Sequence, residues 1–233
     1  IETIKCNAFE NCCDIESVVI PSSVKKIEEN AFKGCINLKT ISIPDSVNII
    51  PAGCFNGCIE LTKVELPSTI TKISNDAFSN CCNLIDILIS DVVTEIGSSA
   101  FHNCSNLCKI QIPDSVIEIG PSAFEGCRSL ESINLSQKIK YINCNTFRGC
   151  ELLNKIWIPK NVAIIGSEAF GGCENMSIVA IQSNHIKIDP TAFLQCSNIS
   201  RLYLANNNPN VVISSFGDSV AIKIISPISD YDR

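Results

Sequence analysis

Apolar residues recur along this chain with a period of 23 residues, and phenylalanine marks that period most clearly. All ten phenylalanines occupy one position of the repeat. They are Phe9, Phe32, Phe55, Phe78, Phe101, Phe124, Phe147, Phe170, Phe193 and Phe216. A single repeat has too few inward side chains to offset the entropy of ordering its backbone. We therefore predict a solenoid in which stacked repeats share their apolar faces.

The hydrophobic spacing within a repeat predicts one strand and one wider segment. An alternating pair such as Ile41 and Ile43 fits a short strand with both side chains facing inward. Proline often follows, as at Pro44, and ends the strand because it has no N–H for the ladder. The remaining spacing, V-x-x-I-x-x-x-A-F, favours turns or a short helical or 3₁₀ segment. We predict one parallel strand per repeat, with the Phe column packed on the opposite, convex side.

A Gly or Asn column stands two residues after Phe. Its members are Gly34, Gly57, Gly126, Gly149 and Gly172, with Asn11, Asn80 and Asn103 as replacements. Both residue types tolerate positive φ, so we predict a left-handed residue that ends the convex segment at this position.

Nine of the fifteen cysteines form a second strict column, three residues after Phe. They are Cys12, Cys35, Cys58, Cys81, Cys104, Cys127, Cys150, Cys173 and Cys196. Their phase predicts inward free thiols, each a small hydrophobe with a weak donor for a nearby carbonyl. The off-column cysteines are Cys6, Cys13, Cys54, Cys82, Cys108 and Cys144. Cys54 replaces the packing Ala that precedes Phe in most repeats, and we expect it in the core.

The densest cysteine group, Cys81, Cys82, Cys104 and Cys108, has the ligand count of a structural zinc site. Its spacing contains no C-x₂-C pair, and two of its members belong to the inward column. We therefore predict no metal and no cofactor, with a Cys82–Cys108 disulfide as the alternative for this group.

Candidate catalytic residues are few, and we predict no enzyme. His102 follows Phe101 on a convex turn, while His185 takes the inward Val column several repeats away, so the two histidines do not pair. We expect His185 to be a partly buried, hydrogen-bonded side chain. The sequence has no phosphate loop, no H-x-x-x-H zinc pair and no nucleophile elbow.

Composition and length limit the remaining classes. The net charge of −6 does not favour a nucleic-acid partner, and no apolar run is long enough to cross a membrane. We predict one domain, residues 1–233, of about ten repeats. The missing initiator Met indicates a mature product or a piece of a longer chain. The repeat decays over 206–233, where Asn208, Ser219 and Pro227 break three columns, and we interpret this part as a degenerate or capping repeat.

The outward strand columns contain the candidate binding residues. Lys63, Lys109, Lys155 and Arg201 recur at 46-residue intervals in one column. Trp157 and Tyr203 stand in the next column and share three predicted rungs with Lys155 and Arg201. Trp, Tyr and Arg dominate interface energetics, which makes this group a candidate binding site. The alternatives are that the cations keep the sheet soluble and that Trp157 only covers the sheet and Ile178.

The motifs L-x-x-I-x-I-P and I-x-x-x-A-F, together with the Cys column, resemble the 23-residue bacterial or Treponema-type leucine-rich repeats of BspA-like proteins. The resemblance covers nearly the whole chain and implies an α/β repeat solenoid in the form of a right-handed superhelix or horseshoe. It implies an adhesion role at the cell surface or in secreted form. We interpret the chain as a non-enzymatic module whose sheet face binds a protein or glycan, and the cation column favours an anionic ligand. The alternative is an intracellular, cytoplasmic scaffold, which the many free thiols favour.

Overall fold

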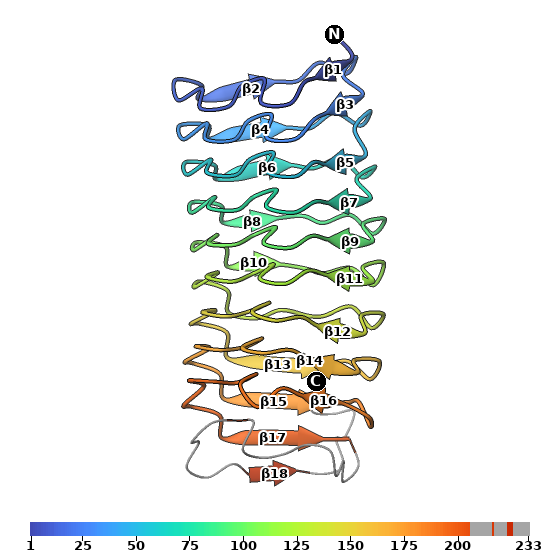
Figure 1. Cartoon of the computed structure of the whole chain (residues 1–233), viewed down its shortest axis with the longest axis vertical. Helices are drawn as coiled ribbons and strands as arrows, with labels where there is room; N and C mark the ends of the chain where they lie inside the picture. The colour runs from blue at the N-terminus through green and yellow to red at the C-terminus, as the bar shows by residue number, and fades with distance from the viewer. Residues whose placement is uncertain (206–215, 217–222, 226–233) are drawn as a thin grey trace.

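The computed structural model describes residues 1–205, Phe216 and the backbone of the strand at Lys223–Ile225. Over residues 1–205 the chain winds into a stack of similar rungs (Figure 1). Each strand pairs in parallel with the equivalent strand of a neighbouring rung, except at a few interruptions. The predicted solenoid of parallel strands is confirmed. The predicted capping or degenerate repeat at 206–233 lies almost wholly outside the described residues.

The alternating Ile-x-Ile segments form a first ladder, as predicted. Its strands are β2 (Ser17–Val19), β4 (Thr40–Ser42), β6 (Lys63–Glu65), β8 (Asp86–Ile87), β10 (Lys109–Ile110), β13 (Lys155–Ile158), β15 (Ile178–Ile181), β17 (Arg201–Leu204) and β18 (Lys223–Ile225). The register places each residue opposite the one 23 positions later, as with Ile41 and Val64. Between β10 and β13 the ladder shrinks to one bridge, Ser132 to Lys155.

A second ladder lies on the right-hand side of Figure 1, which corrects the prediction of one strand per repeat. Its strands are β1 (Thr3–Ile4), β3 (Lys26–Ile27), β5 (Ile49–Ile50), β7 (Lys72–Ile73), β9 (Glu95–Ile96), β11 (Glu118–Ile119), β12 (Tyr141–Ile142), β14 (Ile164–Ile165) and β16 (Lys187–Ile188). Each has only two residues, one facing outward and one Ile facing inward. A segment that short leaves no period-two pattern in the sequence.

Turns, and no helix, connect the rungs through residues 1–205, so the predicted helical or 3₁₀ segments are absent there. The N–H of Cys58 donates to the carbonyl of Phe55 three residues earlier, at 3.1 Å. Other backbone groups bond between rungs instead of along the chain. The N–H of Phe55 donates to Ala77 of the next repeat at 2.8 Å. The convex side is therefore held by hydrogen bonds across the stack, and the architecture is a β-solenoid without an α layer.

Two columns of positive φ explain why no helix forms on the convex side. The predicted column after Phe is confirmed, at Asn11, Gly34, Gly57, Asn80, Asn103, Gly126, Gly149 and Gly172, and it continues to Gln195. A second column, two residues before Phe, was not predicted and comprises Asn7, Asn30, Gly53, Asp76, Ser99, Ser122, Asn145 and Glu168. A left-handed residue on each side of Phe interrupts any helical run after a few residues.

The Phe rings form a continuous buried stack, with adjacent centroids 4.7–5.6 Å apart. This spacing is close to the roughly 4.7–4.9 Å that separates paired strands. Because the strand side and the convex side repeat at similar intervals, the stack runs nearly straight in Figure 1, in place of the expected horseshoe.

The Cys column forms a ladder of thiol donors beside the Phe stack. The thiols of Cys35, Cys58, Cys81, Cys104, Cys127, Cys150, Cys173 and Cys196 each donate to the carbonyl of the Phe in the preceding repeat, with Sγ–O distances of 3.0–3.2 Å. Burial raises the pKa of Cys35 to about 11 and that of Cys58 to about 12. All fifteen cysteines are free thiols, and Cys54 is in the core, as predicted.

Candidate functional site

The longest strands of the first ladder within residues 1–205, β13, β15 and β17, have four residues each. Their register places Ile178 between Lys155 and Arg201. In the next column it places Ala180 between Trp157 and Tyr203. We call the side chains of Lys155, Trp157, Ile178, Arg201 and Tyr203 the sheet patch. The structure therefore brings these predicted candidates together on three successive rungs.

Lys155 and Trp157 form a cation–π pair within β13. The Nζ atom of Lys155 lies 5.4 Å from the centroid of the Trp157 ring. The indole N–H of Trp157 is buried and has no hydrogen-bond partner among the described residues. A buried donor without a partner costs about 1–3 kcal/mol.

Ala180 lies under the sheet patch and is 1% exposed although its strand position faces outward. A small outward side chain is hidden only when larger neighbours cover it, which indicates that Trp157 and Tyr203 close over it. Ile178 and both aromatic side chains are half-buried, whereas Lys155 and Arg201 are exposed. The sheet patch thus has an apolar centre with a cation on each flank.

The remaining predicted cations lie further along the same face. Lys63 on β6 is exposed and pairs with Glu65 of its own strand at 2.7 Å, an interaction that raises the pKa of Lys63. Lys109 on β10 is exposed and lies opposite Asp86 of β8. Both lysines are exposed on strands of the first ladder, but neither belongs to the sheet patch.

Two hollows lie at the turns that follow the first ladder, and the larger of them adjoins Trp157. The larger, of about 730 Å³, is lined by Asn134, Gln137, Lys155 and Trp157, among others. The smaller, of about 440 Å³, is lined by Asn161, Asn184 and His185, among others. Lys160 and Gln182 line both hollows.

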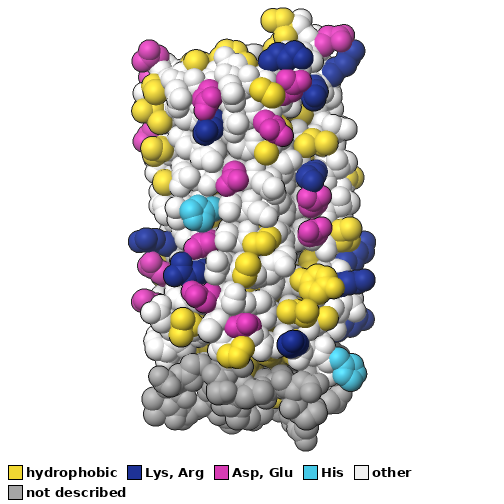
Figure 2. Space-filling model, viewed as in Figure 1, with side chains coloured by type: hydrophobic (Ala, Val, Ile, Leu, Met, Phe, Trp, Pro, Cys, Tyr) yellow, Lys and Arg dark blue, Asp and Glu magenta, His cyan; other side chains and the backbone are white. Residues whose placement is uncertain are grey.

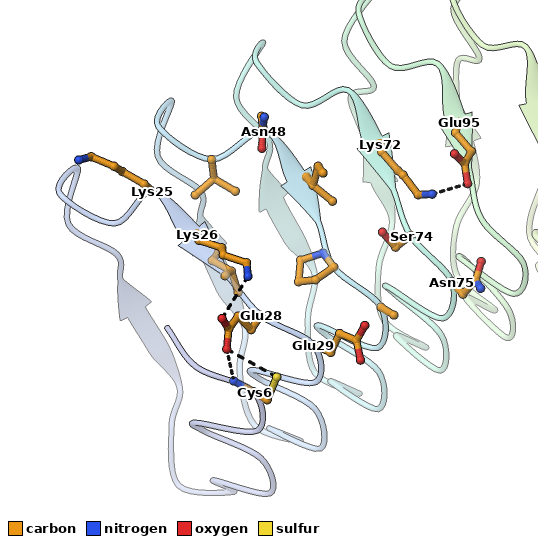
Figure 3. Close-up of a pocket in the computed structure, with 15 residues that line it drawn as sticks. Cys6, Lys25, Lys26, Glu28, Glu29, Asn48, Lys72, Ser74, Asn75 and Glu95 are labelled. Carbon is orange, nitrogen blue, oxygen red and sulfur yellow. Dashed lines mark hydrogen bonds and ion pairs between the residues drawn. The ribbon is translucent and has the colours of Figure 1, made fainter. Parts of the chain in front are cut away.

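A third hollow, of about 870 Å³, lies over the second ladder near the N-terminal end (Figure 3). Several of its charges are neutralised within the protein. Lys26 pairs with Glu28 at 3.1 Å, and Lys72 pairs with Glu95 at 2.7 Å. Because these charges are already paired, few of the charged side chains in this hollow remain for a ligand.

The structure corrects the expected position of His185. This side chain is exposed, and the neighbouring Ile186 takes the inward place, with 2% exposure. An isoleucine fills an apolar site without the desolvation cost of an imidazole. The turn therefore buries Ile186 and leaves His185 exposed. His102 is half-buried on its convex turn and far from His185 in the stack.

The four cysteines that sequence analysis considered as possible zinc ligands donate hydrogen bonds to backbone carbonyls instead. Cys81 and Cys104 belong to the buried ladder, Cys82 donates to the carbonyl of Asn80 at 3.6 Å, and Cys108 donates to that of Ile85 at 3.5 Å. Within the described part of the chain no group of three or more His, Cys, Asp or Glu side chains is arranged for a metal ion.

Sequence reasoning predicted Lys155 and Trp157 but missed the other polar residues that line these two hollows. Gln182 occupies the Pro column and His185 the Val column, so both are departures from the repeat. Those departures were a usable signal, because a turn that abandons the consensus is free to present polar side chains. Lys160 and Asn161 carried no such signal, since exposed turn positions are variable throughout the array.

The fold and this polar surface define a repeat protein of the parallel β-solenoid type. A family model, described as BspA type leucine rich repeat region (6 copies), matches residues 2–130 and 117–230. The chain belongs to this family, as the repeat motifs predicted. A search of the curated proteins gave no match.

Solved structures of bacterial leucine-rich repeat proteins share the fold. A leucine-rich repeat protein of Bacteroides ovatus is 31% identical, with a TM-score of 0.73, over 88% of this chain and 59% of its own. The leucine-rich repeat protein of T. pallidum is 32% identical, with a TM-score of 0.65, over 69% and 78%. A leucine rich cell surface protein of Faecalibacterium prausnitzii is 25% identical, with a TM-score of 0.52, over 96% and 73%. The chain thus spans somewhat more than half of the B. ovatus protein.

Leucine-rich repeat proteins generally serve as protein-binding scaffolds. Among the described residues no helix has both the length and the apolar character needed to cross a bilayer.

Proposed function

We propose that this chain is a non-enzymatic binding and adhesion module that recognises a protein or glycan partner through its first-ladder face. The observation that supports the proposal most strongly is the sheet patch. Its apolar centre is flanked by exposed cations, and its only tryptophan leaves a buried N–H unpaired. Buried donors without a partner are rare in native proteins, and Trp is one of the residue types that dominate interface energetics.

The partner class follows from the same side chains. Aromatic rings beside Lys155 and Arg201 favour a partner that combines an apolar or planar group with negative charge. The family relative from F. prausnitzii is a cell surface protein, which supports a surface or secreted location for this chain.

An intracellular scaffold is the second candidate, because all fifteen cysteines are free thiols. Reducing compartments keep thiols in that state. Burial would also protect the Cys ladder outside the cell, and so the exposed Cys6, Cys13 and Cys144 distinguish the locations. Thiol counting on protein from its natural source separates them: oxidation of these three supports the surface location, and their full reduction supports the scaffold.

The double substitution W157A/R201A tests the sheet patch. Both wild-type and variant chains are immobilised and exposed to a panel of extracellular matrix proteins and to a glycan array. We expect the variant to lose capture while its thermal midpoint stays nearly unchanged, because both side chains lie outside the core. The matched control is V19A/K63A, which removes an exposed apolar side chain and a lysine from the N-terminal part of the same face. Unaltered capture by W157A/R201A would overturn the proposal.

A further inference from the structure

The two hollows at the turns after the first ladder share Lys160 and Gln182 in their linings. Trp157 lines the larger hollow and His185 lines the smaller one, so the shared residues lie between these two side chains. We call the two hollows together the edge groove. Figure 2 shows Lys and Arg side chains gathered along the right-hand edge of the molecule at the level of β11 to β14.

Departures from the repeat shape the edge groove. The consensus places Pro after the first strand, as at Pro113 and Pro159, but Gln182 stands in that column. Its backbone N–H donates to the carbonyl of Ile158 at 3.0 Å, a bond that proline cannot make. This bond extends the ladder by one residue and fixes the backbone of Gln182, whose side chain lines both hollows.

Amide side chains dominate the polar lining. Asn134, Gln137, Asn161, Gln182 and Asn184 each carry a donor and an acceptor. Asn161 already donates through Nδ2 to the carbonyl of Gln137 at 2.7 Å, and its own carbonyl oxygen still has lone pairs for a ligand hydroxyl. Hydroxyl groups both donate and accept, so a polyhydroxylated ligand matches this lining better than an apolar peptide does.

Trp157 and two lysines complete the recognition chemistry. The indole provides an apolar platform for the C–H face of a sugar ring. Lys155 and Lys160 face the groove as cations, whereas Asp114 is its one lining carboxylate and accepts the N–H of Gln137 at 3.1 Å. The local charge is therefore positive on a protein whose net charge is −6, which favours an anionic ligand.

We propose that the edge groove binds an anionic oligosaccharide, whose carboxylate or sulfate groups pair with Lys155 and Lys160. The proposal rests on the proposed binding function of this face and names the ligand class and the residues that select it. Lys160, Gln182 and Asn184 belong to the edge groove alone, whereas Arg201 and Tyr203 belong to the sheet patch alone.

Fluorescence of Trp157, the chain's only tryptophan, reports occupancy directly. The folded chain is titrated with an oligogalacturonate, a sulfated heparin-derived oligosaccharide and a neutral cello-oligosaccharide of similar length. We expect saturable emission changes with one or both anionic probes, weakening as salt is added, and little change with the neutral one. The comparison of the two anionic probes identifies carboxylate or sulfate as the preferred group.

Substitutions separate the edge groove from the sheet patch. K160Q should lower the affinity for the anionic probe about three- to fivefold, which is the range expected for the loss of one exposed ion pair. The control K63Q removes the same charge from β6 and should leave the affinity unchanged, and so should R201A. Equal binding of the neutral probe, no effect of K160Q, or an equal loss with R201A would each overturn the edge groove as an anionic site. If R201A/Y203A, which alters the sheet patch alone, still captures a partner while K160Q weakens binding of the probe, only the sheet patch fails.

Discussion

The thiol of Cys104 donates to the backbone carbonyl of Phe78 in the preceding repeat, with 3.1 Å between Sγ and O. The same carbonyl accepts the N–H of Cys81 at 3.2 Å. One oxygen therefore joins the turn of its own repeat to the core of the next. Because this arrangement recurs along the stack, the Cys column contributes both packing and a donor, which neither Ala nor Val provides.

Replacement of Cys104 by alanine should destabilise the protein. The substitution leaves a small cavity and removes the second donor to Phe78, so we expect the free energy of unfolding to fall by about 1–2 kcal/mol. Urea denaturation followed by circular dichroism measures the change. The control C82A removes a half-buried, off-column thiol and should cost much less. An equal loss for both variants would contradict a specific role for the column.

Thiol reactivity should divide the cysteines by burial. At pH 8 Ellman's reagent should label Cys6, Cys13 and Cys144 rapidly, because these three are exposed. The ladder thiols should react only after unfolding, since burial excludes the reagent and raises the pKa of Cys35 to about 11 and that of Cys58 to about 12. Labelling in urea should reach all fifteen thiols. Mass mapping that finds Cys58 modified as fast as Cys13 in the native protein would show that the ladder is open.

Stability should decline in alkaline solution for the same reason. The folded chain keeps the ladder thiols protonated to a higher pH than the unfolded chain, where their ordinary pKa is about 8.5. The stabilising contribution is therefore complete below that pH and is lost as the pH rises toward about 11–12, the folded pKa values of Cys35 and Cys58. Urea midpoints measured from pH 7 upward test this. The fall of the urea midpoint with rising pH should persist in C13A, whose thiol is exposed. A midpoint that stays constant with pH would contradict the prediction.

Two glycines should respond differently to replacement by alanine. A Cβ on Gly97 would lie 2.5 Å from the backbone nitrogen of Asn75, so the rungs must shift. A Cβ on Gly57 would have its nearest neighbours at 3.8 Å, and the cost there comes from its φ of +76°. We expect G57A to lose about 1 kcal/mol and G97A about 2 kcal/mol or more, as measured by thermal and urea unfolding. The reverse order would show that backbone strain outweighs the close approach.

Much of the fold followed from the sequence because burial repeats in phase. The Phe, Cys and Ile-x-Ile columns predicted the core, the free thiols and the first ladder. The second ladder was missed because Lys72–Ile73 and its equivalents are too short to show alternation. Turns were one of the predicted alternatives for the convex side, but the second column of positive φ was missed because Ser99, Ser122 and Glu168 adopt it without the Gly or Asn that usually marks it.

The candidate site divides in the same way. Trp157, Lys155, Arg201 and Tyr203 were placed together by counting in steps of 23, since outward strand positions follow the repeat. The edge groove was not foreseen, because it depends on how turns of adjacent rungs meet. His185 shows the limit most clearly, since its column predicted an inward side chain and the turn exposes it.

The sequence by itself determined the solenoid, its period and the residues of its core, because burial in a stack requires the same kind of side chain at the same place in every turn. Only the tertiary structure decided which irregular side chains share a surface. Lys160 and Gln182 line the same two hollows because turns of neighbouring rungs lie side by side, and that placement depends on backbone geometry that no periodic pattern records.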